Sequence, residues 1–216
     1  MKYSAGNFRE MAGNAKTVSN NEIHVILEGY SFTDNSGRYR ANGTATLVRT
    51  TNHNIMVDTG SPRDKQKILD GLQNLGLTPE DIDHVVSTHG HVDHAGNLNL
   101  FPNAVHIMCR DICENDDIYK DDPFKEGHKY SIETGQVEVF PTPGHTLGDV
   151  SVIVYNTKYG AVVISGDLFE CRDDCGVWQG NSECVEKQIV SRDRVLKMAD
   201  WIVPGHGPIF QVEKVN

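Results

Sequence analysis

The sequence contains no long apolar run. Its most apolar stretches, such as residues 150–155, fall far short of the ~20 residues that an α-helix needs to cross a bilayer. The first eleven residues, MKYSAGNFREM, lack the apolar core of a secretory signal peptide. We therefore expect a cytoplasmic protein, with the nucleus as an additional location to consider and no membrane partner.

Cysteine pairs of the kinds that stabilise small domains are also missing. Cysteine occurs five times, and no two cysteines have the C-x-x-C spacing typical of zinc ribbons and redox motifs. An odd number of cysteines does not fit a framework of disulfides. The cysteine content therefore favours a reducing compartment.

Positive charge is scarce relative to negative charge. Twenty Lys and Arg stand against thirty Asp and Glu, so the net charge is −10. This balance excludes an overall basic surface for sequence-independent binding to nucleic acid, although a local basic groove stays open.

The hydrophobic pattern predicts an α/β fold. With 216 residues, no internal repeat and no low-complexity linker, the sequence is expected to form a single domain over residues 1–216. Short tracts rich in β-branched residues predict strands at residues 24–32, 44–51, 54–57, 84–88, 105–108, 137–140, 150–155 and 161–165. The last two are nearly all apolar and should be central strands. Helical spacing predicts helices at residues 63–77 and 182–199, the second with Val185, Ile189, Leu196 and Ala199 pointing inward. Helices should therefore cover the faces of the sheets.

Histidine and aspartate cluster in the middle of the chain. His89, His91, Asp93 and His94 lie within six residues, directly after an apolar predicted strand. Imidazole nitrogens and carboxylate oxygens are ligands of Zn²⁺ and other divalent transition metals. In an extended segment His89 and His91 project to the same side, and Asp93 and His94 follow where the chain must turn. One loop could therefore hold ligands for two ions.

Three more residues of ligand type follow at the ends of predicted strands. They are His145, Asp167 and His206, each preceded by a glycine that lets the backbone turn tightly. The remaining histidines are interpreted as ordinary surface or core residues: His24, His53, His84, His106 and His128.

These motifs together resemble the metallo-β-lactamase superfamily of hydrolases. H-x-H-x-D-H is followed by Gly-His, Gly-Asp and Gly-His in that order, and the similarity extends from Asp58 to His206. The resemblance implies a four-layer αββα sandwich with the site at one edge of its two sheets. It also implies two divalent metal ions, with zinc preferred and iron or manganese as alternatives. The implied ligands are His89, His91 and His145 for one ion, Asp93, His94 and His206 for the other, and Asp167 as the bridge.

Asp58 opens the triplet Asp58-Thr59-Gly60, which also occurs in aspartic proteases. Only one such triplet is present, so an aspartic protease would have to be a homodimer, and the ligand-type residues would remain unexplained. Independently of that activity, a homodimer stays open as the assembly of this protein. In a metal site, Asp58 would accept a hydrogen bond from a ligand imidazole and orient it. Asp58 and Asp93 are then the candidate catalytic carboxylates, with Asp93 orienting the attacking hydroxide.

A narrower similarity involves residues 96–101, 149–154, 166–170 and 194–208. It is to a small single-domain branch of the superfamily to which histone pre-mRNA 3′-end cleavage has been assigned. This implies a hydrolase in which two ions lower the pKa of a shared water to near 7 and RNA is the substrate. A glyoxalase II-like hydrolase of a small ester or thioester is the main alternative, and the acidic charge balance favours it. A non-catalytic metal-binding or sensor module and an iron-dependent oxidoreductase also stay open.

Overall fold

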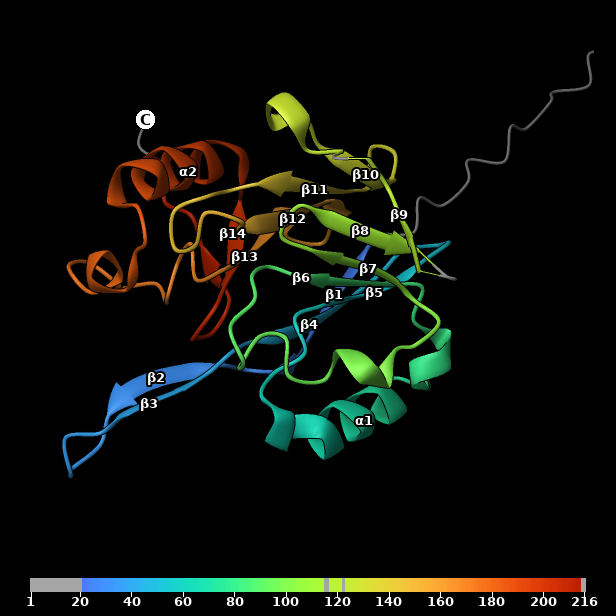
Figure 1. The fold of residues 1–216 in the computed structure, drawn as a ribbon, viewed down its shortest axis with the longest axis horizontal. Coiled ribbons are helices and arrows are strands. Elements are labelled where there is room, and N and C mark those ends of the chain that lie inside the picture. The colour runs from blue at the N-terminus through green and yellow to red at the C-terminus, as the bar shows by residue number, and fades with distance from the viewer. Residues whose placement is uncertain (1–20, 115–116, 122, 215–216) are drawn as a thin grey trace, which may run out of the picture.

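The protein is described by a computed structural model that covers residues 21–114, 117–121 and 123–214. One sheet has seven strands, in the spatial order β1 (Glu22–Leu27), β4 (Ala45–Arg49), β5 (Asn54–Val57), β6 (His84–Ser87), β7 (Val105–Met108), β8 (Asp111–Glu114) and β9 (Ile118–Tyr119). A second sheet has six, in the order β10 (Tyr130–Glu133), β11 (Val137–Pro141), β12 (Val150–Thr157), β13 (Gly160–Gly166), β14 (Trp201–Pro204) and β15 (Phe210–Gln211). The strands β2 (Tyr30–Thr33) and β3 (Tyr39–Asn42) pair only with each other and project from the body as an arm (Figure 1).

Two α-helices occur in the described residues, α1 (Lys65–Asn74) and α2 (Val185–Met198). Short 3-10 turns complete this part of the chain: η1 (Pro62–Asp64), η2 (Pro79–Asp81), η3 (Leu98–Leu100), η5 (Lys125–Gly127) and η6 (Trp178–Asn181). Neither α-helix is long and apolar enough to cross a membrane.

Side chains along each strand alternate between two cores, because successive residues of a strand point to opposite faces. In β5, Ile55 and Val57 enter a core between the two sheets, whereas Met56 enters the core that includes α1. In β13, Val162 enters the core between the sheets and Val163 packs in the core that includes α2. The layers therefore run α1, seven-stranded sheet, six-stranded sheet, α2 (Figure 1). The predicted four-layer αββα sandwich is confirmed, as are the central positions of β12 and β13.

The predicted strand at residues 24–32 is divided in the structure. It ends at Leu27, and β2 leaves the sheet to pair with β3. The division lies at Gly29, where a Cβ would stand only 2.5 Å from the backbone oxygen of Gly205. The short strands β3, β8, β9, β10, β14 and β15 were not predicted, because each has only two to four residues, too few for a clear periodic pattern.

The predicted inward face of the last helix is partly wrong. Ala199, just beyond α2, is fully buried, but Ile189 and Leu196 are 47% and 38% exposed. The buried face of α2 is instead formed by Gln188, Ser191 and Val195. A mainly polar buried face indicates that α2 packs partly against backbone carbonyl groups, and these belong to the loops described below.

The orientation of α2 predicts that truncating two neighbouring side chains, Val195 and Leu196, lowers the free energy of unfolding by unequal amounts. Val195→Ala should lower the free energy of unfolding by about 1.5–3 kcal/mol, because it deletes two buried methyl groups and leaves a cavity. Leu196→Ala should cost less than about 1 kcal/mol, because that side chain is partly in solvent. Urea unfolding of both variants measures the difference. Equal losses, or a larger loss for Leu196→Ala, would contradict this orientation.

Candidate metal centre

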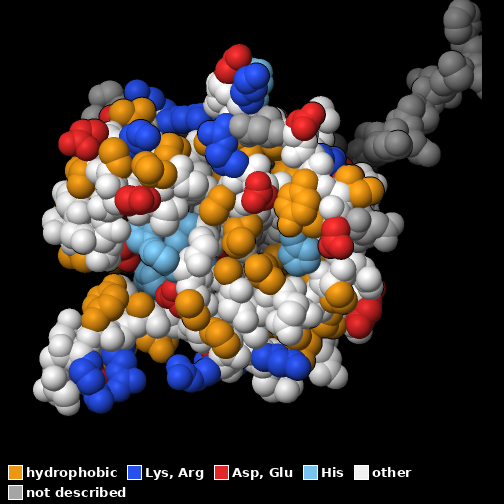
Figure 2. All heavy atoms as spheres, in the orientation of Figure 1, with side chains coloured by type: hydrophobic (Ala, Val, Ile, Leu, Met, Phe, Trp, Pro, Cys, Tyr) orange, Lys and Arg blue, Asp and Glu red, His pale blue; other side chains and the backbone are white. Residues whose placement is uncertain are grey.

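Four loops converge at one edge of the two sheets and bring all seven predicted ligand residues together. They follow β6, β11, β13 and β14, and they carry His89, His91, Asp93, His94, His145, Asp167 and His206. Because β5 pairs with β6 and β13 with β14 in parallel, the segments after these strands leave the sheets at the same edge. Figure 2 shows histidine side chains gathered in a hollow beside the β2–β3 arm.

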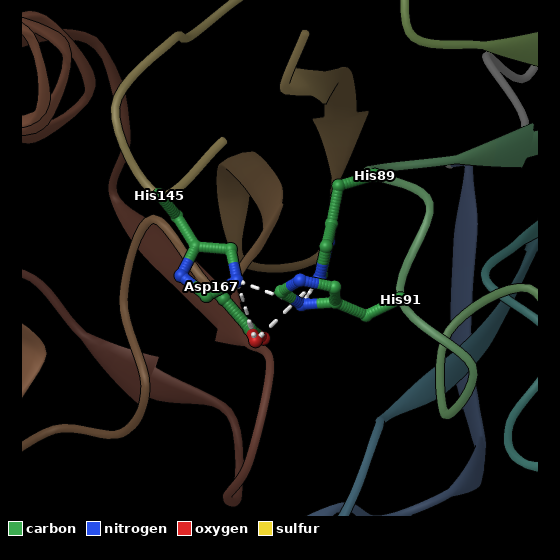
Figure 3. Close-up of side chains that lie close together, drawn as sticks. All are labelled: His89, His91, His145 and Asp167. Atoms are coloured by element: carbon green, nitrogen blue, oxygen red, sulfur yellow. Dashed lines mark hydrogen bonds and ion pairs between the residues drawn. The ribbon is translucent and has the colours of Figure 1, made fainter. Parts of the chain in front are cut away.

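The first group consists of three imidazoles and one carboxylate. His91 Nδ1 lies 3.0 Å from His89 Nε2 and 3.1 Å from His145 Nε2. Asp167 Oδ2 lies 3.6 Å from His89 Nε2 and 3.3 Å from His145 Nε2 (Figure 3). Four ligands at ~2.0–2.2 Å from a tetrahedral ion are ~3.3–3.5 Å apart, so these donors are spaced for one ion such as Zn²⁺.

The second group lies on the other side of Asp167. The Nε2 atoms of His94 and His206 are 3.0 Å and 3.2 Å from Asp167 oxygens, and His206 Nε2 is 3.9 Å from Asp93 Oδ2. His94 Nε2 and Asp167 Oδ1 are buried and make no hydrogen bond of acceptable geometry with the described residues. Buried polar atoms normally have a partner, and a cation would supply one here. The donor set and its spacing therefore fit divalent metal ions.

The imidazoles and carboxylates of the cluster shift one another's pKa values. Although burial opposes protonation, the carboxylates of Asp167 and Asp58 raise the pKa of His94 well above its usual value. Although burial opposes ionisation, His94 and His206 hold the pKa of Asp167 well below its usual value. An ion bound through His94 Nε2 therefore takes the place of a proton.

Asp58 lies behind His94 rather than in the pocket. Its Oδ2 is 2.9 Å from His94 Nδ1, and its two oxygens accept hydrogen bonds from the backbone N–H and the hydroxyl of Thr88. The backbone of Asp58 is in the left-handed region, at φ 58°, which few residues other than glycine adopt. This arrangement fixes the ring of His94 with Nε2 toward Asp167.

The helix α2 holds two of the converging loops. Gln188, which is fully buried, donates from Nε2 to the backbone oxygens of Asp167 and Leu168, at 3.1 and 3.3 Å. The hydroxyl of Ser191 donates to the backbone oxygen of Pro143, at 2.8 Å. The polar buried face of α2 therefore ties the loop of Asp167 to the loop that contains His145.

The seven predicted residues do not account for the whole cavity. It has a volume of about 240 Å³ and is lined by Tyr39, Ala41, His91, Asp93, His145, Asp167, Glu170, Asn181 and His206. Glu170 is 2% exposed, and its pKa is raised by burial and by the Asp167 carboxylate. Sequence reasoning missed Glu170 and Tyr39, because neither belongs to a recognisable ligand motif. The five histidines interpreted as ordinary residues belong to no ligand cluster in the described part of the chain.

Comparisons with known proteins agree with this geometry. The sequence pattern described as Metallo-beta-lactamase superfamily matches residues 38–108. Metallo-beta-lactamase domain-containing protein 1 of Xenopus laevis is 44% identical over 197 residues, covering 91% of this chain and 84% of that protein. The human protein of that name is 39% identical over 218 residues, covering 88% and 82%. An N-acyl homoserine lactone hydrolase, solved with its product at the catalytic metal centre, superposes with a TM-score of 0.62 at 21% identity, covering 88% and 94%.

The position of Asp58 predicts a loss of metal affinity on Asp58→Asn. The amide cannot carry the negative charge that pairs with the His94 imidazole, so affinity for an ion at His94 should fall about 10- to 100-fold. Competition with a coloured chelator measures the affinity, and Asp70→Asn, on the exposed side of α1, is the matched control. Unchanged affinity in a folded Asp58→Asn variant would remove this role.

Proposed function

The chain belongs to the metallo-β-lactamase superfamily, and from that premise we propose that this metal-dependent hydrolase uses two divalent ions to cleave phosphodiester bonds in RNA. By its resemblance to the small single-domain branch, the substrate would be histone pre-mRNA at its 3′ end. The proposal is supported by the two groups of donors that meet at Asp167 and by the arm beside the cavity.

We assign the donors as the resemblance implies. His89, His91 and His145 would hold one ion, and Asp167 would bridge to the second. The second ion would be held by Asp93, His94 and His206. Two such ions supply a nucleophile at neutral pH and stabilise the attacking and leaving oxygens.

Asp93 is the carboxylate that a substrate reaches first. Its side chain is 24% exposed, against 5% for Asp167 and 2% for Asp58. A carboxylate has two oxygens, so Asp93 can use one as a ligand and accept a hydrogen bond from the attacking water with the other. Asp58 does not line the cavity, and it would act through His94 as a positioning residue.

The β2–β3 arm is the structural feature that favours RNA as the substrate. Tyr39 and Ala41 of β3 line the cavity. Arg40 lies between them in the strand and therefore projects from the other face, where it and Arg38 both contact Asp34; the two arginine side chains are 50% and 66% exposed. Both arginines pair with Asp34, which leaves one net positive charge among these three side chains. An exposed aromatic ring can stack a base, and cationic side chains on the other face of the arm would contact the phosphates of a single strand that crosses the arm.

The size of the cavity agrees with a substrate that lies mostly outside it. About 240 Å³ is less than the ~300–1,000 Å³ of pockets that enclose a small molecule. Only the scissile group and its neighbours would enter, and the rest of a strand would lie across the arm.

One observation favours the alternative, hydrolysis of a neutral ester or thioester. Three carboxylates, Asp93, Asp167 and Glu170, line the cavity, and no Lys or Arg lines it among the described residues. Two ions would offset much of this negative charge, but a neutral substrate meets less repulsion than a phosphodiester.

The donor arrangement predicts two ions per chain. Elemental analysis of gently purified protein should find about two, because seven donors exceed the needs of one tetrahedral ion. Asp167→Asn should lower the rate more than the affinity for the ion at His89, His91 and His145, because three imidazoles remain there. At most one ion in the wild type, even after metal is added, would contradict the two-ion site.

The arm predicts how the rate depends on salt. Cleavage of single-stranded RNA should slow as salt rises, and Arg38→Ala with Arg40→Ala should reduce the logarithmic slope by about 1.4, at ~0.7 per phosphate contact. Tyr39→Ala should raise KM for RNA roughly 5- to 150-fold through lost stacking. Lys197→Ala, at an exposed position of α2, is the control and should change neither.

The same series separates the two candidate substrates. Hydrolysis of a small thioester should depend little on salt and on the arginines. RNA cleavage that is insensitive to salt, or that persists at full rate in Asp167→Asn, would contradict the RNA proposal and favour the ester.

A further inference from the structure

Glu170 is held beside His206 by backbone hydrogen bonds between two loops. The backbone N–H of His206 donates to the backbone oxygen of Glu170 at 2.7 Å, and that of Gly205 donates to Phe169 at 2.9 Å. These bonds join the loop that carries Asp167 to the loop that carries His206. The backbone hydrogen bonds that position the loops of the predicted ligands therefore also position the Glu170 side chain.

The two oxygens of Glu170 have different surroundings. Oε1 accepts a hydrogen bond from Asn181 Nδ2 at 2.8 Å, whereas Oε2 faces His206 Nε2 at 3.8 Å. Among the described residues, no Lys or Arg forms an ion pair with this carboxylate, although its side chain is only 3% exposed. A buried carboxylate without a cation is costly, so this position calls for a positive charge.

Glu170 and Asp93 lie at similar distances from His206. The distances from His206 Nε2 are 3.8 Å to Glu170 Oε2 and 3.9 Å to Asp93 Oδ2. One donor atom each of Asp167, Glu170 and His206 lie within 4.8 Å of one another. Donors of one ion, each at ~2.0–2.2 Å from it, are at most ~4.4 Å apart, so the Glu170 oxygen is near enough to His206 to serve the same ion after little movement.

We propose that Glu170 is an additional ligand of the ion at Asp93, His94 and His206, and that this ligand makes the position selective for a harder ion such as Mn²⁺. The inference rests on the two-ion site proposed above. It assigns the second position three carboxylates, from Asp93, Glu170 and the bridging Asp167, beside two imidazoles.

The chemical contrast with the first position follows from the donors. Three imidazoles and one carboxylate suit Zn²⁺, whereas carboxylate-rich sites suit Mn²⁺. Each added carboxylate also brings a negative charge and an oxygen donor, which a hard ion uses better than a borderline-soft one. The two positions should therefore differ in their preference between Zn²⁺ and Mn²⁺.

The test measures metal binding directly. Metal-free full-length protein is loaded with one equivalent of Zn²⁺ and titrated with Mn²⁺, and free Mn²⁺ is followed by electron paramagnetic resonance. The wild type should bind one Mn²⁺ in addition to the zinc. Glu170→Gln should weaken that binding about tenfold or more, with zinc binding at the first position unchanged.

Controls separate a lost ligand from a lost charge or a lost fold. Gln at position 170 keeps an acceptor for Asn181, so the metal-free variant should unfold at the same temperature as the wild type. Asp173→Asn removes an exposed acid three residues away and should leave Mn²⁺ affinity within about twofold, since exposed charges are screened.

The outcomes distinguish this inference from the proposed function. A wild type that binds no second ion of either metal contradicts the two-ion site itself. A wild type that binds two ions, with Glu170→Gln binding Mn²⁺ equally well, overturns only the role of Glu170. An equal loss in Glu170→Gln and Asp173→Asn also overturns it, because the effect would then be long-range charge.

Discussion

One buried carboxylate, that of Asp167, is the contact on which the site depends. Its oxygens lie 3.0–3.6 Å from ring nitrogens of His89, His94, His145 and His206, which come from three other loops. Such a concentration of donors away from water is stable only when charge and hydrogen bonds are balanced. Divalent ions between these groups would balance them, and the surrounding structure is arranged to keep the donors at this spacing.

The residues around Asp167 keep its carboxylate close to the histidine ligands. A Cβ at Gly205 would overlap Asp167 Oδ1, so the loop before His206 can pass this close only with glycine. Gln188 holds the backbone oxygen of Asp167 from the other side, which explains a buried amide on a helix that would otherwise bury apolar residues. The site thus shapes α2 as much as the core does.

The cavity and the arm favour different features of a substrate. The cavity is small and lined by carboxylates, which suits a compact reacting group whose charge the metal ions would offset. The arm offers Tyr39 at the cavity and arginines on its other face, which the RNA proposed above would contact by crossing the arm. An acidic protein can therefore present a local surface for an anion without an overall basic charge.

The sequence by itself determined the longer strands of the two central layers, such as β12 and β13, because their apolar pattern is local. It also determined the residue types available as ligands, because these are clustered or stand next to glycines after predicted strands. Only the tertiary structure decided that the imidazole held by Asp58 is that of His94, that Glu170 faces His206 and that α2 turns Gln188 inward. These contacts join residues 20 to 40 positions apart, through strand pairing and loop packing. Local periodicity carries no information about such distances, whereas the register of parallel strands fixes which strand ends meet at one edge.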